Sequence, residues 1–499
     1  MLLSNALERI PVIDCLGDVG VRISGISYDS RSVREGHLFV AVKGEKTDGN
    51  RFVQQAIRSG AAAVASEHMT GAAQQKVAAI LVEDARRFLA EISRVFFDDP
   101  AEKLTLTAIT GTNGKTTTSY LMESIFESAG LRSCLIGTIG MKIGDRSCEA
   151  RHTTPEAPDL TIFLKQAVEQ GCTHGALEVS SHALVLKRVF GTRFKVGIFT
   201  NLTQDHLDFH RDMESYYQAK RLLFSSENEN RVEHAVINID NPYGRRLVSE
   251  TDCPAMSFGF DAGAAIHVVR CENHVDATDL TLKTPAGEIT FHAHMIGKPN
   301  VYNVMAATGA ALCQGLAPEQ IRNGVEALRG VPGRVERVKT GQDFSVIVDY
   351  AHSPDALENL LNTISGLPHS RLILVFGCGG DRDKGKRPIM GEIAAGMSDL
   401  VVATSDNPRS EDPLQILRDI EAGLSKGPAQ YVVEPDRSKA IDSAISLAAP
   451  GDVVVIAGKG HENYQILEDR TVPFDDARIA EELIRKRELE RKDVNTDCS

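Results

Sequence analysis

Short hydrophobic runs alternate with amphipathic segments along most of the chain. Runs at 104–109, 371–377 and 452–456 read as strands, and helical spacing follows the first two. Strands that alternate with helices predict mostly parallel sheets covered by helices on both faces. One stretch, 267–295, alternates residue by residue and predicts antiparallel strands instead. The pattern therefore predicts an α/β protein.

Two sequence features divide the chain. Its 499 residues exceed the roughly 250–300 that one hydrophobic core supports. Pro100 follows two aspartates, and Pro332 lies within the glycine-containing segment 329–336. We therefore expect three domains, at 1–100, 101–332 and 333–499, the last a second doubly wound unit.

Composition bears on the kinds of molecule that the protein can bind and on where it is found. The formal net charge is -13, which argues against nucleic acid or an anionic membrane as partner. Nine cysteines are scattered without a CxxC pair, as in a reduced protein. No secretory signal and no apolar run long enough to span a membrane is present, so we expect a cytoplasmic protein.

The strongest chemical motif is GTNGKT, from Gly111 to Thr116, between a predicted strand and a predicted helix. Glycines there let backbone N–H groups face phosphate, and the helix N-terminus adds a positive field. Lys115 can neutralise phosphate and Thr116 can bind Mg²⁺. A full Walker A motif has glycine where this chain has Ile109, so the motif alone is an imperfect match.

Three further positions carry possible metal chemistry. Glu178 ends a predicted strand, where ligands of open sheets gather. His206 and His210 would share a helix face, but no third zinc ligand has a telling spacing, so one histidine near Mg²⁺ is the better interpretation. Lys220, taken alone, is an ordinary lysine of an amphipathic helix.

Polar loops also follow four predicted strands of the last third. They begin at Asp349, near Asp381, at Asp406 and at Gly458. Carboxyl ends of parallel strands meet at one edge of a sheet, so together these loops predict a binding edge.

In this order, the motifs TGTNGKTTT, EVSSH, NLTQDHLDFH, AKRLLF, GRVE, VDYAHSPDAL, FGCGGDRDKGKRP, DNPR and AGKGHE resemble those of the Mur ligase family. The resemblance runs from Tyr28 to the segment after Gly458, nearly the whole chain. The family uses the short GxxGKT loop, which accounts for Ile109.

The resemblance implies a UDP-sugar-binding N-terminal domain, a central P-loop ATP-binding domain and a C-terminal Rossmann-like domain for the incoming amino acid. It implies an ATP-dependent ligase of peptidoglycan precursor synthesis that adds meso-diaminopimelate to UDP-N-acetylmuramoyl-L-Ala-D-Glu. ATP would convert the D-Glu γ-carboxylate to an acyl phosphate, which the amine attacks. The expected cofactors are ATP, Mg²⁺ and a CO₂-derived carbamate on Lys220, and we expect a monomer.

The resemblance also assigns residues by group. Those expected to hold ATP are Gly111, Thr112, Asn113, Gly114, Lys115, Thr116, Thr117, Asn303, Arg334 and Asp349. Those expected at Mg²⁺ are Thr116, Glu178, His206 and carbamylated Lys220, and Lys115, Lys220, His206 and Arg334 are the expected catalytic set. Those expected at the UDP-sugar substrate are Tyr28, Ser30, Glu45, Lys46, Thr47, His152, Thr153, Thr154, Ser180, Leu186 and Arg188. Those expected at diaminopimelate are Arg382, Asp406, Asn407, Pro408, Arg409, Gly458 and Glu462.

Alternatives remain at this stage. A lysine-adding ligase of the same family, or a folylpolyglutamate synthase-like ligase, keeps the reaction class. A P-loop binding or switch protein would need neither an acceptor pocket nor a carbamylated lysine. Arg409 favours diaminopimelate over lysine, because its planar guanidinium can hold a second carboxylate by two parallel hydrogen bonds.

Overall fold

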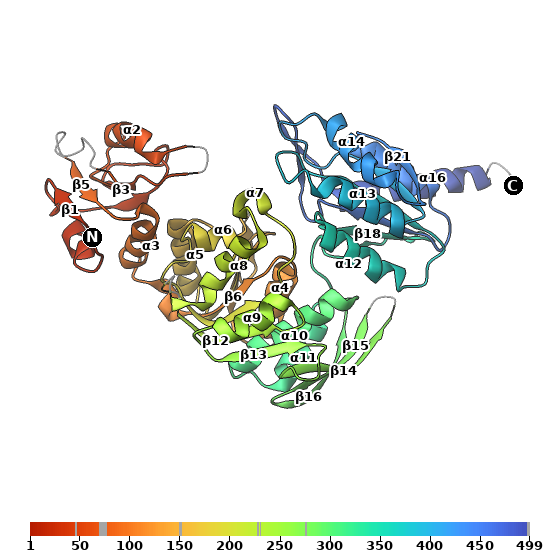
Figure 1. The fold of residues 1–499 in the computed structure, drawn as a ribbon, viewed down its shortest axis with the longest axis horizontal. Helices are drawn as coiled ribbons and strands as arrows, with labels where there is room; N and C mark the ends of the chain where they lie inside the picture. Colours follow the sequence, from red (N-terminus) through yellow and green to blue (C-terminus); the bar gives the residue numbers. More distant parts are fainter. Residues whose placement is uncertain are drawn as a thin grey trace.

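A computed structural model describes residues 1–44, 47–68, 77–148, 152–226, 229, 231–274 and 277–496. The expected substrate residues Glu45 and Lys46 lie outside these ranges. Three α/β domains follow one another along the chain, each built around its own sheet (Figure 1). The predicted fold class is confirmed.

The N-terminal domain has a five-stranded sheet in the order β1-β5-β4-β3-β2, parallel except for β1. Helix α3 begins at Asp84, whose side chain accepts a hydrogen bond from the Arg87 amide and caps the helix. The elements are α1 (Leu3–Leu7), β1 (Asp14–Leu16), β2 (Gly25–Ser27), β3 (His37–Val40), α2 (Val53–Arg58), β4 (Ala63–Ser66), β5 (Ala78–Leu81) and α3 (Ala85–Phe96).

The central domain has an eleven-stranded sheet in the order β16-β15-β14-β13-β12-β11-β6-β10-β7-β8-β9. Its middle strands are parallel, and α4, α10 and α11 cover one face while α5, α6, α8 and α9 cover the other. The antiparallel strands predicted over 267–295 are β14 to β16. The strands are β6 (Thr105–Thr110), β7 (Ser133–Ile136), β8 (Met141–Ile143), β9 (Arg146–Cys148), β10 (His174–Glu178), β11 (Arg193–Phe199), β12 (Arg231–Asn238), β13 (Ala255–Gly259), β14 (Ile266–Asn273), β15 (Thr278–Thr284) and β16 (Gly287–Ala293). The helices are α4 (Lys115–Ser128), α5 (Ala157–Glu169), α6 (Ser181–Val185), α7 (Leu207–His210), α8 (Met213–Arg221), α9 (Pro242–Glu250), α10 (Lys298–Cys313) and α11 (Pro318–Ala327).

The C-terminal domain has a six-stranded sheet in the order β17-β18-β22-β19-β20-β21, parallel except for β17. Helices α12, α13 and α14 pack on one face and α15 and α16 on the other, as in a doubly wound domain. The elements are β17 (Glu336–Val338), β18 (Ser345–Asp349), α12 (Pro354–Ser365), β19 (Leu372–Phe376), α13 (Lys386–Met397), β20 (Leu400–Ala403), α14 (Pro413–Leu424), β21 (Gln430–Val433), α15 (Arg437–Leu447), β22 (Val453–Ala457), β23 (Tyr464–Ile466), β24 (Thr471–Pro473) and α16 (Asp476–Thr496).

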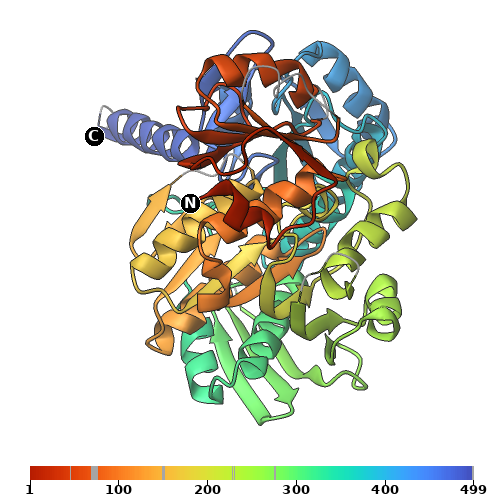
Figure 2. The same cartoon turned by 90° about the vertical axis from the view of Figure 1, so that its left-hand side faces the viewer.

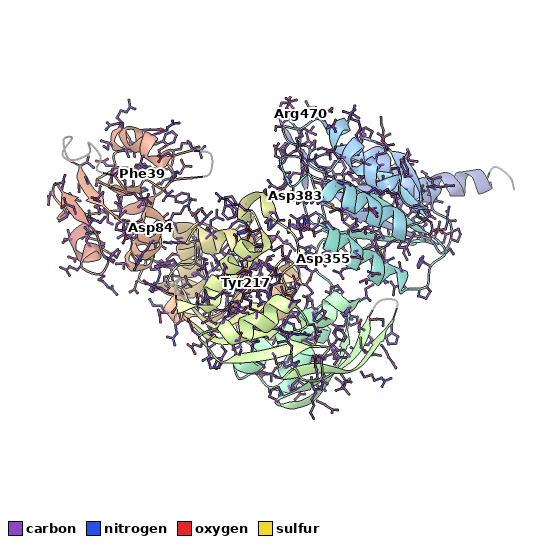
Figure 3. The ribbon with its side chains drawn as sticks, viewed as in Figure 1. Phe39, Asp84, Tyr217, Asp355, Asp383 and Arg470 are labelled. Atoms are coloured by element: carbon purple, nitrogen blue, oxygen red, sulfur yellow. The ribbon has the colours of Figure 1, made fainter. Side chains whose placement is uncertain are left out.

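The central domain lies between the other two, and the view turned by 90° brings the N-terminal domain to the front (Figures 1 and 2). The start of α12 faces the central domain, as the position of Asp355 shows (Figure 3). None of the helices within the described ranges has the length and apolarity needed to cross a membrane.

Candidate active site

The phosphate-loop motif lies where the sequence predicts it, between β6 and α4. Gly111 and Gly114 both have positive φ, and a Cβ added at Gly114 would lie 2.4 Å from Asn303 Oδ1, so this turn requires glycine. Lys115 Nζ donates to the carbonyl oxygens of Gly111 and Thr112, each at 2.9 Å. Burial lowers the pKa of Lys115, and a bound anion would favour its charged form.

Glu178 ends β10 beside this loop with its side chain fully buried. Its carboxylate accepts from the Thr138 amide at 3.0 Å and from the Thr138 hydroxyl at 2.8 Å. These bonds fix the orientation of a charged group that burial would otherwise disfavour. Thr138 was not singled out in the sequence, because it lies in an unremarkable loop after β7.

Lys220, on α8, is buried beside the same loop. Its Nζ donates to the Gly111 carbonyl at 2.9 Å and lies 4.6 Å from the centre of the Tyr216 ring. Burial, and then the charge of Lys115, hold the pKa of Lys220 well below its ordinary value. A neutral amine in this position is the form that reacts with CO₂.

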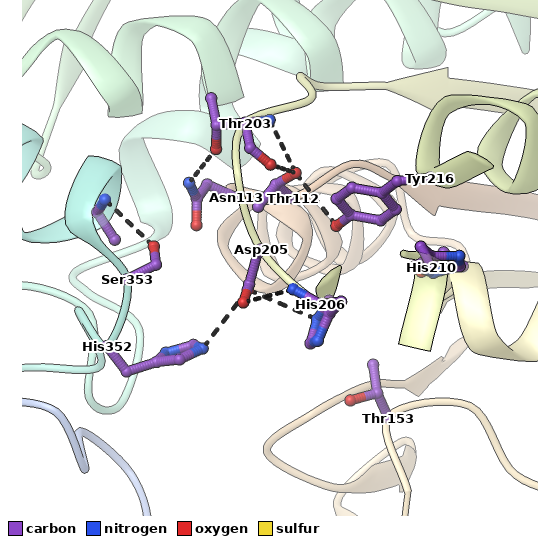
Figure 4. A network of polar contacts seen from close by, with 12 residues as sticks. Thr112, Asn113, Thr153, Thr203, Asp205, His206, His210, Tyr216, His352 and Ser353 are labelled. Carbon is purple, nitrogen blue, oxygen red and sulfur yellow. Dashed lines mark hydrogen bonds and ion pairs between the residues drawn. The ribbon is translucent and has the colours of Figure 1, made fainter. Parts of the chain in front are cut away.

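Figure 4 shows the polar network around His206. The Asp205 carboxylate lies 3.6 Å from His206 Nε2 and 3.9 Å from His352 Nε2, so it links the central and C-terminal domains. Desolvation keeps the pKa of His206 below its ordinary value, which leaves a ring lone pair for a metal ion. His210 Nε2 instead lies 2.8 Å from Ser181 Oγ, and no group of three potential metal ligands among the described residues contains His206 or His210.

A cavity of about 360 Å³ opens at the phosphate loop, between the central and C-terminal domains. Arg334 Nη2 reaches Thr116 Oγ1 at 3.2 Å, and Asn113 Nδ2 donates to the Asp355 carboxylate at 2.7 Å. Asp349 is buried, which raises its pKa, and accepts from the Val335 and Ala351 amides. The lining combines Asn113, Gly114, Thr116, Thr117 and Asn303 with Arg334, Asp349 and Asp355.

Residues expected at the UDP-sugar form two groups. Tyr28 donates from the N-terminal domain to Asp159 of α5 at 2.6 Å, whereas Ser30 contacts Gln55 within its own domain. Thr154 is the centre of the second group: its hydroxyl donates to the Glu178 carbonyl, and its own carbonyl accepts from Arg188. The remaining described members, Thr47, His152, Thr153, Ser180 and Leu186, lie on loops or at the ends of α6.

The four polar loops of the C-terminal sheet do share one edge, because β18, β22, β19 and β20 are parallel neighbours. Asn407 donates to Glu462 at 2.8 Å and accepts from Lys459 at 3.1 Å. Arg409 Nη1 donates to the Gly380 carbonyl at 2.7 Å. Arg382 lies nearby, because a Cβ added at Gly379 would lie 2.9 Å from Arg409 Nη1 and 3.7 Å from Arg382 Cγ. Burial, and then the Arg382 charge, lower the pKa of Arg409.

This edge also contains residues that the sequence analysis missed. Lys459 is fully buried between Asn407 and Glu462, contacts that its position in the loop motif AGKGHE does not by itself predict. Asp355, in the first turn of α12, accepts from Asn113 of the phosphate loop and was not among the expected site residues. Asp406 and Gly458 approach closely, because a Cβ added at Gly458 would lie 2.7 Å from Asp406 Oδ2.

The phosphate-loop motif thus lies at a cavity between the central and C-terminal domains, an arrangement that suits an enzyme that couples a nucleotide to a second substrate. Comparison with known proteins agrees over nearly the whole chain. Residues 22–97 match the model described as Mur ligase family, catalytic domain; 109–311 match the Mur ligase middle domain; and 333–460 match the Mur ligase, glutamate ligase domain. The chain belongs to the Mur ligase family.

The names of individual relatives identify a particular ligase within the family. The UDP-N-acetylmuramoyl-L-alanyl-D-glutamate–2,6-diaminopimelate ligase of Solibacter usitatus is 46% identical over 93% of this chain and 94% of the relative. The ligase of the same name from Geobacillus thermodenitrificans is 43% identical over 98% of this chain and 100% of its own. A solved structure of a ligase with this name superposes with a TM-score of 0.69 at 33% identity, covering 97% of this chain and 99% of that one.

Proposed function

We propose that this protein joins meso-diaminopimelate to the D-Glu γ-carboxylate of UDP-N-acetylmuramoyl-L-Ala-D-Glu, with hydrolysis of ATP to ADP and phosphate, in peptidoglycan precursor synthesis. The observation that carries the proposal is the pair of contacts, Arg334 to Thr116 and Asp355 to Asn113, that joins the C-terminal domain to the phosphate loop. The relatives named above supply the identity of the two substrates.

The reaction needs ATP because a carboxylate is a poor electrophile at neutral pH. The γ-phosphoryl group passes to the carboxylate, and the amine then attacks the acyl phosphate, releasing phosphate. Lys115 and Arg334 would neutralise the developing phosphate charge from opposite domains. The protein otherwise positions the reactants, which converts an encounter of two molecules into an oriented reaction.

The Thr116 hydroxyl and the Glu178 carboxylate suit Mg²⁺, which prefers oxygen ligands, and the neutral His206 ring can add a nitrogen. Bound Mg²⁺ would supply Lewis-acid stabilisation of the phosphate oxygens. Lys220 fits this site as a carbamate, since its cationic form has no lone pair to offer. Its burial next to Lys115 supports carbamylation, because the resulting anion would pair with that cation.

We assign the UDP-sugar to the junction of the N-terminal and central domains, and diaminopimelate to the edge formed by Arg382, Asp406–Arg409, Gly458 and Glu462. We also propose that the boundaries between the three domains lie near Pro100 and Pro332. We propose that the protein acts as a monomer, with one chain supplying all the residues assigned to the nucleotide cavity.

ADP release measured with ATP and the UDP-linked dipeptide, with and without meso-diaminopimelate, tests the ligase function. The proposal expects sustained ADP release that requires both the dipeptide and the amino acid, and a product heavier by one diaminopimelate residue. ADP release that is independent of any acceptor would instead indicate a P-loop ATPase or switch protein.

A further inference from the structure

The three-stranded antiparallel ribbon β14–β15–β16 forms one margin of the central sheet, four strands beyond β6 and its phosphate loop (Figure 1). Its register pairs Glu272 with Asp279 and Asp279 with His292, which puts the three in one row across the ribbon. The neighbouring row of side chains includes Leu280 and Phe291, which pair with each other and are buried in the core. Because successive residues face opposite sides, the Glu272 row faces solvent.

These side chains, with His274 just beyond β14, form what we name the ribbon cluster: Glu272, His274, Asp279 and His292. His274 Nε2 lies 2.7 Å from Asp279 Oδ2, and His292 Nδ1 lies 2.7 Å from Asp279 Oδ1. One ligand atom each from Glu272, His274 and Asp279 lies within 4.8 Å of the other two. Among the residues that the structure describes, no other three histidine, cysteine or acidic side chains form such a group.

We propose that Glu272, His274 and Asp279 bind a divalent transition-metal ion of the zinc type, and that His292 is a positioning residue for Asp279. Imidazole with two carboxylates is a ligand set that suits Zn²⁺ better than Mg²⁺. The two carboxylates together balance the charge of a divalent ion. The site is separate from the Mg²⁺ chemistry proposed at Thr116 and Glu178.

The geometry requires small movements. Ligand atoms at about 2.0–2.2 Å from zinc lie closer together than the 4.8 Å limit within which these atoms fall. Side chains that are 42–51% exposed can rotate by this amount without disturbing the core. Arg270 donates to Glu272 Oε1 at 2.9 Å, which leaves Oε2 for the ion, and its 66% exposure allows it to turn away.

His292 orients Asp279 within the cluster. It holds one Asp279 oxygen while the other faces His274, as hydrogen-bonded carboxylates do around bound metal ions. The competing interpretation is a set of His–Asp pairs that stabilise the ribbon without any ion. Both interpretations predict the same contacts, so metal titration must separate them.

The test is calorimetric titration of ZnCl₂ into the full-length protein, with excess Mg²⁺, a non-chelating reductant and no chelator. The wild-type protein should bind one more zinc ion per chain than the His274→Ala/Asp279→Asn variant. His292→Ala should lower the affinity for that ion by about 10–100-fold. His369→Ala, a change in the C-terminal domain, is the matched control and should titrate like wild type.

Co²⁺ provides a second readout, because its visible absorption reports ligand number and type. Glu272→Gln replaces one ligand while preserving the shape of the side chain. This variant therefore tests zinc binding if the double variant fails to fold. Identical zinc stoichiometry and affinity in wild type, Glu272→Gln and the double variant would overturn the proposal and leave a hydrogen-bonded surface cluster.

Discussion

At the scale of single residues, the account depends on two buried lysines beside one carbonyl. Lys115 and Lys220 both donate to Gly111, so two amines share a desolvated site, and burial lowers the pKa of each. Such a site is unfavourable for two cations and favourable once phosphate and a carbamate arrive. The unfavourable placement of two amines in one desolvated site indicates that these lysines serve to bind ligands rather than to pack the core.

Lys115→Ala should therefore abolish ADP production, a loss of at least about 10²–10³-fold, because the charge that stabilises the transferring phosphoryl group is gone. The fold should survive, so thermal unfolding is the accompanying measurement. Lys103→Ala, which removes an exposed partner of Asp98, is the control and should keep full activity. Near-normal ADP production by Lys115→Ala would refute the phosphate-loop assignment.

Lys220→Ala should be nearly inactive and should regain part of its activity when short-chain carboxylates are added, since they can replace the carbamate anion. Lys165→Ala, a surface lysine paired with Glu169, should show neither effect. Carbon-13 NMR with labelled bicarbonate would detect the carbamate directly. An unmodified Lys220 ammonium in the nucleotide-bound protein would contradict carbamylation.

At the scale of elements, the acceptor edge depends on a buried ion pair behind it. Arg437, at the start of α15, pairs with Asp476, at the start of α16, and both side chains are fully buried. Arg437 also donates to the carbonyl of Ala457, at the end of β22, at 3.0 Å. The pair thus ties two helices to a strand end next to Gly458.

Arg437→Met should destabilise the C-terminal domain by about 3–5 kcal/mol, because it leaves the Asp476 carboxylate buried without its partner. Thermal unfolding of the variant should show a lower midpoint. The double variant Arg437→Met/Asp476→Leu, which removes both charges, should recover much of the loss. Equal stability of wild type and Arg437→Met would show that water reaches this pair.

The sequence predicted these elements better than their contacts. Helix–strand alternation predicted both large sheets, and the period-two pattern over 267–295 predicted β14 to β16. Nothing local distinguishes Arg437 or Lys459 from surface cations, since burial of a charge depends on partners such as Asp476 or Asn407, far away in the sequence. Lys220 was likewise an ordinary helical lysine until the family resemblance assigned it a role.

At the scale of the whole molecule, two domain junctions set the geometry. The N-terminal junction combines two polar contacts, Tyr28 with Asp159 and Lys187 with Asp84, with a small buried apolar cluster of Ala90, Ala157 and Phe190. The C-terminal junction meets at the phosphate loop, through Arg334 and Asp355. The connecting segment 331–334 contains a tight turn, in which the Arg334 amide donates to the Val331 carbonyl.

We predict that this segment is a hinge and that the C-terminal domain moves when nucleotide and both substrates bind. Polar junctions of this kind allow domain motion, and closure would exclude water from the acyl phosphate. Small-angle X-ray scattering should show a smaller radius of gyration with ATP analogue, UDP-linked dipeptide and diaminopimelate than without ligands. Superimposable profiles in the two states would argue against a hinge.

Selectivity for the amino-acid substrate involves the whole molecule, because the proposed pocket must select one amino acid and deliver it to the acyl phosphate. Arg409 has a left-handed φ of 54° and is half-buried, and in the proposed pocket its guanidinium would pair with the second carboxylate of diaminopimelate. Lysine lacks the second carboxylate and would leave Arg409 unpaired, at a cost of about 2–5 kcal/mol if water is excluded.

The most direct measurement is a competition, in which equal concentrations of meso-diaminopimelate and L-lysine are offered with ATP and the UDP-linked dipeptide, and the products are separated by mass. The account predicts that the diaminopimelate product exceeds the lysine product by about 30-fold or more, and that Arg409→Ala loses the diaminopimelate product. Comparable amounts of the two products from the unaltered protein would contradict the account.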